Sequence, residues 1–203
     1  MSVMRTCLMI LLATAVVGCG PSTPVKGGGE PVASGVAFIG GPFNLVDQDG
    51  RPQDQRLLNG KWSALFFGYT YCPDICPTTL QALAQTKAQL GGAAKDLQIV
   101  FVSVDPERDT PAQIKAYLQT PAFAQPTIGL TGTPEQVAAA VKAYRVVVQK
   151  QGTGEGYTVN HTAVIYLMDP KGQFDRPITE TLSPAEMAAQ IRDAMKAGPK
   201  VSS

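Results

Sequence analysis

Two short and almost uninterrupted apolar runs constrain the fold of this chain more than any other feature. They are WSALFFGY at residues 62–69 and LQIVFVSV at residues 97–104. Each run has the length of a strand, and a strand without polar alternation is typical of a sheet that is buried on both faces. Because such a sheet needs covering helices, the two runs favour an α/β fold.

The segments between and after these runs carry helix and turn signals. Pro77 suits the first turn of a helix over residues 77–90, and Gly91-Gly92 would end that helix. An Asp49-Gly50 turn predicts a hairpin within residues 43–52, ahead of the first apolar run. Further helices are expected at 110–118, at 133–144 and from a capping box at 183–186, with strands at 128–130, 145–150 and 163–168. This alternation predicts one three-layer α/β domain with parallel strands, at residues 37–203.

The first residues look like a targeting segment. Arg5 precedes an apolar run at residues 7–17, which is too short for a membrane-spanning helix of about 20 residues. The run leads into Val16-Val17-Gly18-Cys19, which is similar to a bacterial lipobox. We therefore expect a lipoprotein signal peptide at residues 1–18 and lipidation of Cys19. An ordinary signal peptide with an incidental cysteine, or a buried helix, is the alternative.

Residues 19–36 are expected to be a lipidated cysteine and a flexible linker, because residues 20–35 contain five glycines and three prolines. This organisation predicts an anchored lipoprotein on the periplasmic side of a bacterial cell envelope. That compartment is oxidising, so a pair of thiols there either forms a disulfide or is kept reduced for a purpose.

The composition excludes several classes of function. With 17 basic and 16 acidic side chains and no long basic run, the chain is not expected to bind nucleic acid. A single histidine excludes a zinc protein with several histidine ligands. Of the four cysteines, Cys7 would be lost with the signal peptide and Cys19 would carry lipid. Cys72 and Cys76 therefore remain for chemistry.

Cys72 and Cys76 lie between the first apolar run and the helix expected after it. In parallel α/β sheets, sites gather at the carboxyl ends of strands, and a helix N-terminus favours thiolate. Two cysteines four residues apart on a helix share one face, with Cβ atoms about 5–6 Å apart. This spacing suits two ligands of one metal ion or a disulfide. The alternative is a purely structural role, either as a structural disulfide or as two small buried residues.

His161, the only imidazole, comes just before the expected strand 163–168. A lone histidine is usually an ordinary surface or packed residue, but in a thioredoxin-like domain this loop would lie against the dithiol loop. Two thiolates and an imidazole suit copper, whereas structural zinc would need a fourth strong ligand. Asp74 could influence the thiols or weakly bind oxidised copper, and a helix-capping role is equally expected.

The segment Asp105–Asp109 ends the second apolar run. It is expected either to begin the next helix with local ion pairs or to form a rim or docking surface near the metal.

Three motifs together resemble the Sco/SenC family of copper-binding proteins that help assemble cytochrome c oxidase. They are GYTYCPDICPTTL at residues 68–80, SVDPERDTP at 103–111 and VNHTAVIYLMDPKG at 159–172. The resemblance implies a thioredoxin-like sheet flanked by helices with an extra N-terminal β-hairpin. It also implies one copper ion per chain, held by Cys72, Cys76 and His161. Asn160 departs from the acidic residue that many relatives carry there, and a lipid anchor would replace the family's usual transmembrane anchor.

The resulting hypothesis is a membrane-tethered copper metallochaperone, a carrier rather than an enzyme. Its expected partner is the copper domain of cytochrome c oxidase subunit II, with another periplasmic copper chaperone or a thiol reductase as a further partner. The enzymatic alternative is a thiol–disulfide oxidoreductase that uses the same two cysteines. Copper sensing or redox signalling through partner contacts is a third interpretation, and these roles are compatible because thiol oxidation controls metal binding.

Overall fold

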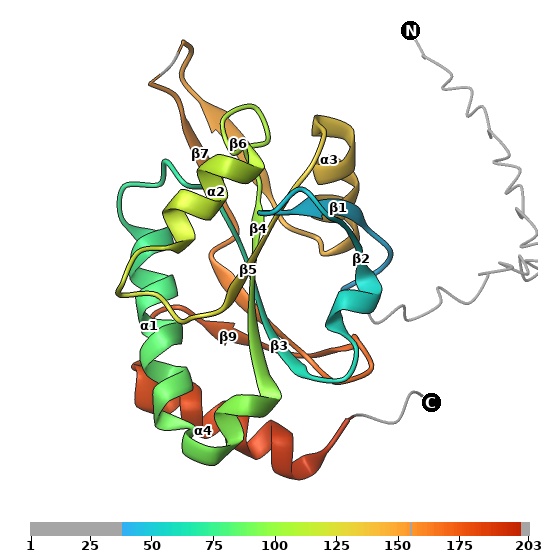
Figure 1. The fold of residues 1–203 in the computed structure, drawn as a ribbon, viewed down its shortest axis with the longest axis vertical. Helices are drawn as coiled ribbons and strands as arrows, with labels where there is room; N and C mark the ends of the chain where they lie inside the picture. The colour runs from blue at the N-terminus through green and yellow to red at the C-terminus, as the bar shows by residue number, and fades with distance from the viewer. Residues whose placement is uncertain (1–37, 155, 200–203) are drawn as a thin grey trace, which may run out of the picture. The chain divides into compact units, whose positions relative to one another are not determined.

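The computed structural model describes residues 38–154 and 156–199, which form a central sheet covered by helices (Figure 1). The strands are β1 (Asn44–Asp47), β2 (Pro52–Asp54), β3 (Trp62–Gly68), β4 (Leu97–Ser103), β5 (Thr127–Thr131), β6 (Val148–Gln151), β7 (Thr158–His161), β8 (Val164–Met168) and β9 (Phe174–Thr179). The α-helices are α1 (Ile75–Gln89), α2 (Pro111–Leu118), α3 (Pro134–Ala143) and α4 (Pro184–Ala197), and 3-10 turns occupy Gln55–Leu58 and Gly91–Asp96. Seven strands make one sheet in the order β2-β1-β5-β4-β3-β8-β9, while β6 and β7 form a separate two-stranded ribbon.

The two apolar runs are β3 and β4, which lie side by side as the parallel centre of the sheet, with Phe66 opposite Phe101. Every residue of β3 is buried, as expected for a strand covered on both faces. The α/β prediction is confirmed, but the expectation of uniformly parallel strands is wrong. Only β3, β4 and β5 run parallel, whereas β8 is antiparallel to β3 and β1 is antiparallel to β5. The short turn between β8 and β9 permits only an antiparallel pair.

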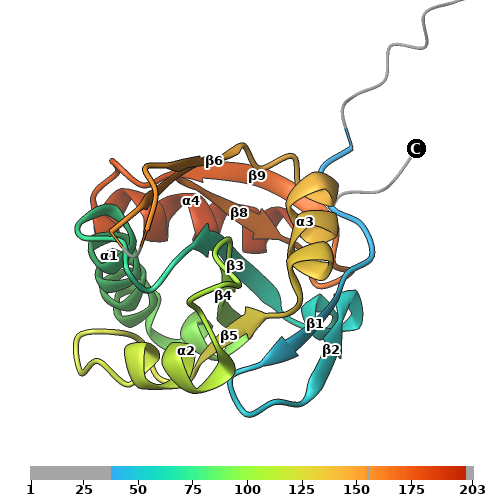
Figure 2. The same cartoon turned by 90° about the horizontal axis from the view of Figure 1, so that it is seen from above.

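Helices cover both faces of the sheet, as the view from above shows (Figure 2). On one face, the Phe101 ring packs against Tyr117 of α2 with ring centroids 5.8 Å apart. On the opposite face, the Phe67 ring packs against Tyr144, the residue that follows α3, at 5.5 Å. Helix α4 packs along α1, and alternating side chains of β3 and β4 thus fill two apolar layers.

The helices begin at the capping residues that the sequence contains. The capping box at Ser183 is confirmed, because its hydroxyl accepts from the Glu186 amide at 3.3 Å while the Glu186 carboxylate accepts from the Ser183 amide at 2.8 Å. Helix α1 begins at Ile75, two residues earlier than predicted, with Asp74 as its N-cap. Pro77 still lies in the first turn, where a missing N–H costs no intrahelical hydrogen bond.

The predicted N-terminal hairpin is confirmed as β1 and β2, which extend the sheet beyond β5. The strand expected at 145–150 is instead β6, and it pairs with β7 rather than with the central sheet. Sequence reasoning treated the residues of β7 as a loop. It also missed β9, whose Pro177 reads as a strand breaker but is tolerated on an edge strand.

The predicted signal peptide at residues 1–18, the lipidation site Cys19 and the linker at 19–36 lie outside the described residues. Within the described part of the chain, no helix has both the length and the apolar character needed to cross a bilayer.

Candidate metal site

The two cysteines lie where β3 leads into α1. Cys76 is in the first turn of α1 and is fully buried, whereas Cys72 lies in the preceding loop and is partly exposed. The Cys76 amide donates a hydrogen bond to the Cys72 sulfur at 3.4 Å. Amide groups at the start of a helix point toward this sulfur and stabilise negative charge on it. The loop is therefore built to hold a thiolate at Cys72.

Burial and hydrogen bonding shift the pKa values of the two thiols in opposite directions, with Cys76 as the hydrogen-bond donor and Cys72 as the acceptor. The hydrogen bond from the Cys76 thiol, with further help from backbone amides, lowers the pKa of Cys72 to about 3 against the opposing effect of burial. The same hydrogen bond, together with burial, raises the pKa of Cys76. One proton is thus shared between two sulfurs, and a soft cation that binds both would displace it.

His161 is the last residue of β7, and its Nε2 lies 3.5 Å from the Cys76 sulfur. Its Nδ1 lies 3.1 Å from the Thr162 carbonyl oxygen. Because a carbonyl oxygen can only accept, this contact places the ring proton on Nδ1 and turns the lone pair of Nε2 toward the sulfurs. The rings of Tyr69 and Phe66 meet the imidazole edge-on at 6.0 and 6.1 Å between centroids and hold its plane.

One ligand atom from each of Cys72, Cys76 and His161 lies within 4.8 Å of the others. Two atoms that bind one ion at about 2.0–2.3 Å can be at most about 4–4.6 Å apart, so small side-chain rotations bring all three onto one centre. Cys72 and His161 line a cleft of about 310 Å³ between the Pro73–Ile75 segment and β7, whereas Cys76 is buried. Two soft sulfurs and one imidazole nitrogen match a soft, low-coordination metal ion.

Asp74 is outside this three-residue group. It precedes α1, and its carboxylate accepts a hydrogen bond from the Thr78 hydroxyl at 3.4 Å, while no backbone amide of α1 donates to it. Its place as the N-cap residue agrees with the capping interpretation, although the capping hydrogen bond is missing.

The buried carboxylate of Asp109 holds the loop that leads to Cys72. Asp109 accepts from the Thr70 amide at 3.0 Å, from the Thr70 hydroxyl at 2.6 Å and from the Ser103 hydroxyl at 2.6 Å. Burial raises the pKa of Asp109 even though these hydrogen bonds oppose the shift. The rim interpretation of residues 105–109 is therefore wrong for Asp109, which is completely buried. The local ion-pair interpretation holds for Asp105, which pairs with Arg108 at 2.6 Å.

Several supporting residues were not identified from the sequence. Thr70 and Ser103 fix the cysteine loop through their hydrogen bonds to Asp109. Tyr69 fixes the β6–β7 ribbon, because its hydroxyl accepts a hydrogen bond from the Val159 amide at 3.3 Å. Arg108 and Tyr157 join them at the same end of the sheet. The only sequence signal for these contacts was that the three motifs at 68–80, 103–111 and 159–172 occur together.

Comparisons with known proteins show which family this chain is similar to. The SCO1/SenC family model matches residues 32–196. The Arabidopsis thaliana protein described as SCO1 homolog 1, mitochondrial, is 42% identical over 147 residues, which are 71% of this chain and 43% of that protein. This chain thus spans about half the length of the curated relatives that it matches.

Solved structures share the fold. Bradyrhizobium japonicum ScoI, described with copper bound, is 44% identical with a TM-score of 0.70, covering 76% of this chain and 98% of that one. A SCO1/SenC family lipoprotein from Bacillus anthracis is 29% identical with a TM-score of 0.67, covering 80% and 95%. The thioredoxin-like prediction is confirmed by these neighbours and by the sheet order. From the family match over most of its length, its identity to these relatives and its fold, the chain belongs to the SCO1/SenC family.

Proposed function

We propose that this protein binds one copper ion through Cys72, Cys76 and His161 and delivers it during assembly of the dinuclear copper centre of cytochrome c oxidase. The observation that carries the proposal is the convergence of two sulfurs and one imidazole nitrogen within 4.8 Å, beside a cleft that Cys72 and His161 line. Copper in the related Bradyrhizobium japonicum structure supports the choice of metal. Thiolates satisfy cuprous copper, and the imidazole adds the nitrogen that cupric copper prefers.

The cleft and the exposed side chains around it suit a carrier that passes its ion to another protein. Two of the few large apolar side chains that are exposed in the described residues lie here, with Tyr71 just before Cys72 and Ile75 between the two cysteines. Because the Cys72 sulfur is accessible and the Cys76 sulfur is buried, a recipient's ligands would reach the ion from the Cys72 side. The proposed recipient is the copper domain of oxidase subunit II, and another periplasmic copper chaperone or a thiol reductase would load or reduce the site.

Copper binding is tested on the reduced soluble domain by metal analysis and by electron paramagnetic resonance of the cupric form. We expect one copper ion per chain, and loss of tight binding in Cys72→Ser and Cys76→Ser. His161→Ala should retain cuprous copper on two thiolates but lose the nitrogen hyperfine signal of cupric copper. Identical cupric spectra for the wild type and His161→Ala would contradict the role of His161.

A thiol–disulfide oxidoreductase is the second candidate, and the lowered pKa of Cys72 favours it. The Cys72 thiolate would attack a substrate disulfide and release one substrate thiolate, which takes up a proton. Cys76, losing its proton, would then attack the Cys72 sulfur and break the mixed disulfide, and the second substrate thiolate would leave and take up that proton. The chain is thereby oxidised to a disulfide and the substrate is reduced by two electrons. A deletion strain separates the two functions: rescue of oxidase activity by added copper supports delivery, and rescue by a small thiol reductant alone supports reduction.

We also propose that the domain is tethered to the periplasmic face of a bacterial membrane through a lipid on Cys19, with residues 1–18 removed and 19–36 as the linker. The lipobox-like sequence and the description of the Bacillus anthracis relative as a lipoprotein support this proposal. Cys19→Ser should release the protein from the membrane fraction. An unmodified mature N-terminus at another residue, seen by mass spectrometry, would refute it.

A further inference from the structure

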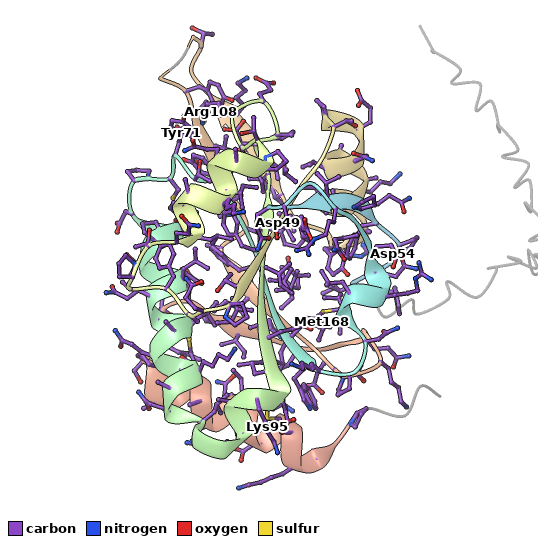
Figure 3. All side chains as sticks on the ribbon, in the orientation of Figure 1. Asp49, Asp54, Tyr71, Lys95, Arg108 and Met168 are labelled. Atoms are coloured by element: carbon purple, nitrogen blue, oxygen red, sulfur yellow. The ribbon has the colours of Figure 1, made fainter. Side chains whose placement is uncertain are left out.

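A cluster of aromatic rings around Arg108 lies beside the candidate metal site. The Arg108 guanidinium carbon is 3.6 Å from the ring centroid of Tyr157 and 4.7 Å from that of Tyr71. Tyr157 immediately precedes β7, which ends at His161, and Tyr71 immediately precedes Cys72. Figure 3 labels Arg108 and Tyr71 close together at the end of the molecule from which the ribbon projects. One guanidinium therefore contacts the segments that carry both kinds of ligand.

Polar contacts fix the orientation of this guanidinium. Arg108 Nε donates to the Asp105 carboxylate at 2.6 Å, and Arg108 Nη1 donates to the Tyr157 carbonyl at 3.1 Å. The Tyr157 hydroxyl donates to the other oxygen of Asp105 at 2.6 Å. The Arg108 side chain is only 15% exposed, so these contacts are largely shielded from water. A planar group held by hydrogen bonds and stacked on rings is a function that arginine performs and lysine does not.

The ribbon depends on such contacts because its strands pair only with each other. Strands β6 and β7 share no backbone ladder with the seven-stranded sheet in the described residues. The position of His161 relative to the cysteines therefore depends on two things: the short link from His161 to β8, which begins at Val164, and side chains between the ribbon and the body of the domain. Arg108 is the most buried cation among them, whereas Lys150, which lies 3.8 Å from the Tyr157 ring centroid, is 45% exposed and pairs with the exposed Glu107.

We propose that Arg108 is a positioning residue that locks the β6–β7 ribbon, and with it His161, against the loop that carries Cys72. The inference rests on the proposed ligand set for its effect on copper, but the locking itself is a property of the metal-free protein. Arg108 does not touch the metal. It limits the movement of the imidazole away from the sulfurs, as residues behind metal ligands commonly do.

Hydrogen exchange of the metal-free domain tests the lock directly. In Arg108→Gln, the amides of β6 and β7 should exchange faster by on the order of tenfold, while those of β3 stay at wild-type rates. Arg108→Lys keeps the charge but not the planar stack, so it should resemble Arg108→Gln. Lys150→Gln is the matched control and should leave the ribbon nearly unchanged. Wild-type exchange of the ribbon in both Arg108 variants would overturn the proposal.

Copper release and the cupric spectrum test the effect on the site. Transfer of cupric copper to a chelator should be about tenfold faster in Arg108→Gln than in the wild type, with weaker nitrogen hyperfine structure. Cuprous copper on two thiolates should change little. A variant that melts earlier but keeps wild-type release and spectrum would show that Arg108 is only structural, and would overturn its positioning role.

Two further variants keep the proposal testable if Arg108→Gln folds poorly. Tyr71→Leu removes a half-exposed ring from the cysteine side and should accelerate release in the same direction by a smaller factor. Tyr157→Phe keeps the ring under Arg108 and should behave more like the wild type. If Tyr71→Leu releases copper at the wild-type rate, the proposal is wrong. If instead His161→Ala leaves the cupric spectrum unchanged, the ligand set fails, and the exchange experiment alone decides whether Arg108 locks the ribbon.

Discussion

Replacing Gly68 by alanine should disturb the metal site without removing any ligand. Gly68 is the last residue of β3, and a Cβ atom there would lie 2.9 Å from the Cys76 sulfur and 2.8 Å from Cε2 of Phe101. Ordinary contacts begin at 3.4 Å, so the sulfur must move by about 3.4 − 2.9 = 0.5 Å, or the helix that carries it must shift. Gly68 is not among the residues with positive φ, so alanine suits its backbone and the effect is purely steric.

The size of the effect follows from the crowding. Overpacking a close-packed core costs about 1–3 kcal/mol, which for a domain of this size lowers the melting temperature by roughly 2–12 °C. A metal site needs its ligands within about 0.5 Å of their working positions. We therefore expect copper affinity to fall about tenfold, as it does when the groups that orient a ligand are removed.

Thermal unfolding with and without copper measures both effects in one series. Gly68→Ala should melt earlier than the wild type and should gain less stability from copper. Gly92→Ala is the matched control, because a Cβ atom there meets nothing within 4 Å and Gly92 is exposed. That control should stay within about 0.5 kcal/mol of the wild type, or be slightly more stable. Unchanged melting and an unchanged copper shift in Gly68→Ala would refute the close contact between Gly68 and Cys76.

Two further predictions follow from the pKa shifts. Because the pKa of Cys72 is lowered to about 3, iodoacetamide should modify Cys72 nearly as fast at about pH 5 as at about pH 8. Cys76 should react far more slowly. A steep rise in the rate of Cys72 modification over that pH range would contradict its thiolate character. Burial alone would raise the pKa of Asp47, but hydrogen bonds within the β1–β2 hairpin outweigh it and lower that pKa. Asp47→Asn should therefore lower the free energy of unfolding by about 1–3 kcal/mol at neutral pH. The difference from the wild type, measured by urea unfolding, should shrink as the pH falls below 3.8. A carboxyl whose pKa is lowered in the folded state loses its stabilising contribution when it is protonated. Asp49→Asn, at a more exposed carboxylate, should cost less, and a pH-independent loss in Asp47→Asn would contradict the shift.

The strands and helices that were predicted well are those whose burial leaves a periodic or continuous apolar signal. Strand β3 is apolar at nearly every position because both of its faces are covered. A strand was predicted at 145–150, but three of the four residues of β6, in the segment VQKQ, are exposed, so no apolar pattern indicated which strand it pairs with. In β7 only Val159 is buried, and a single buried residue gives no alternating pattern. The sequence therefore could not indicate that His161 ends a strand rather than a loop.

The proposed ligand residues could be selected from the sequence, but the groups that hold them in place could not. Two cysteines four residues apart and a single histidine leave few alternatives, whereas aspartate and arginine are common in surface loops. Asp109 contacts Thr70 across 39 positions in the sequence, and Arg108 contacts Tyr157 across 49. Neither separation corresponds to a helix or strand period, so only the folded topology brings these pairs together.

The ligands of the proposed site stand on parts of the fold that differ in how they are held. Cys76 is anchored in α1 against the centre of the sheet, and Cys72 is fixed to it by the Cys76 amide. His161 belongs to a ribbon that is held to the domain by the short link to β8 and by side chains. Under the proposed ligand set, the thiolates alone suffice for cuprous copper, whereas cupric copper needs the imidazole. Movement of the ribbon would thus change which oxidation state the site retains while the cysteine pair stays in place. Under the proposed ligand set, the two cysteines therefore bind the ion, and the position of His161 determines whether its cupric form is retained.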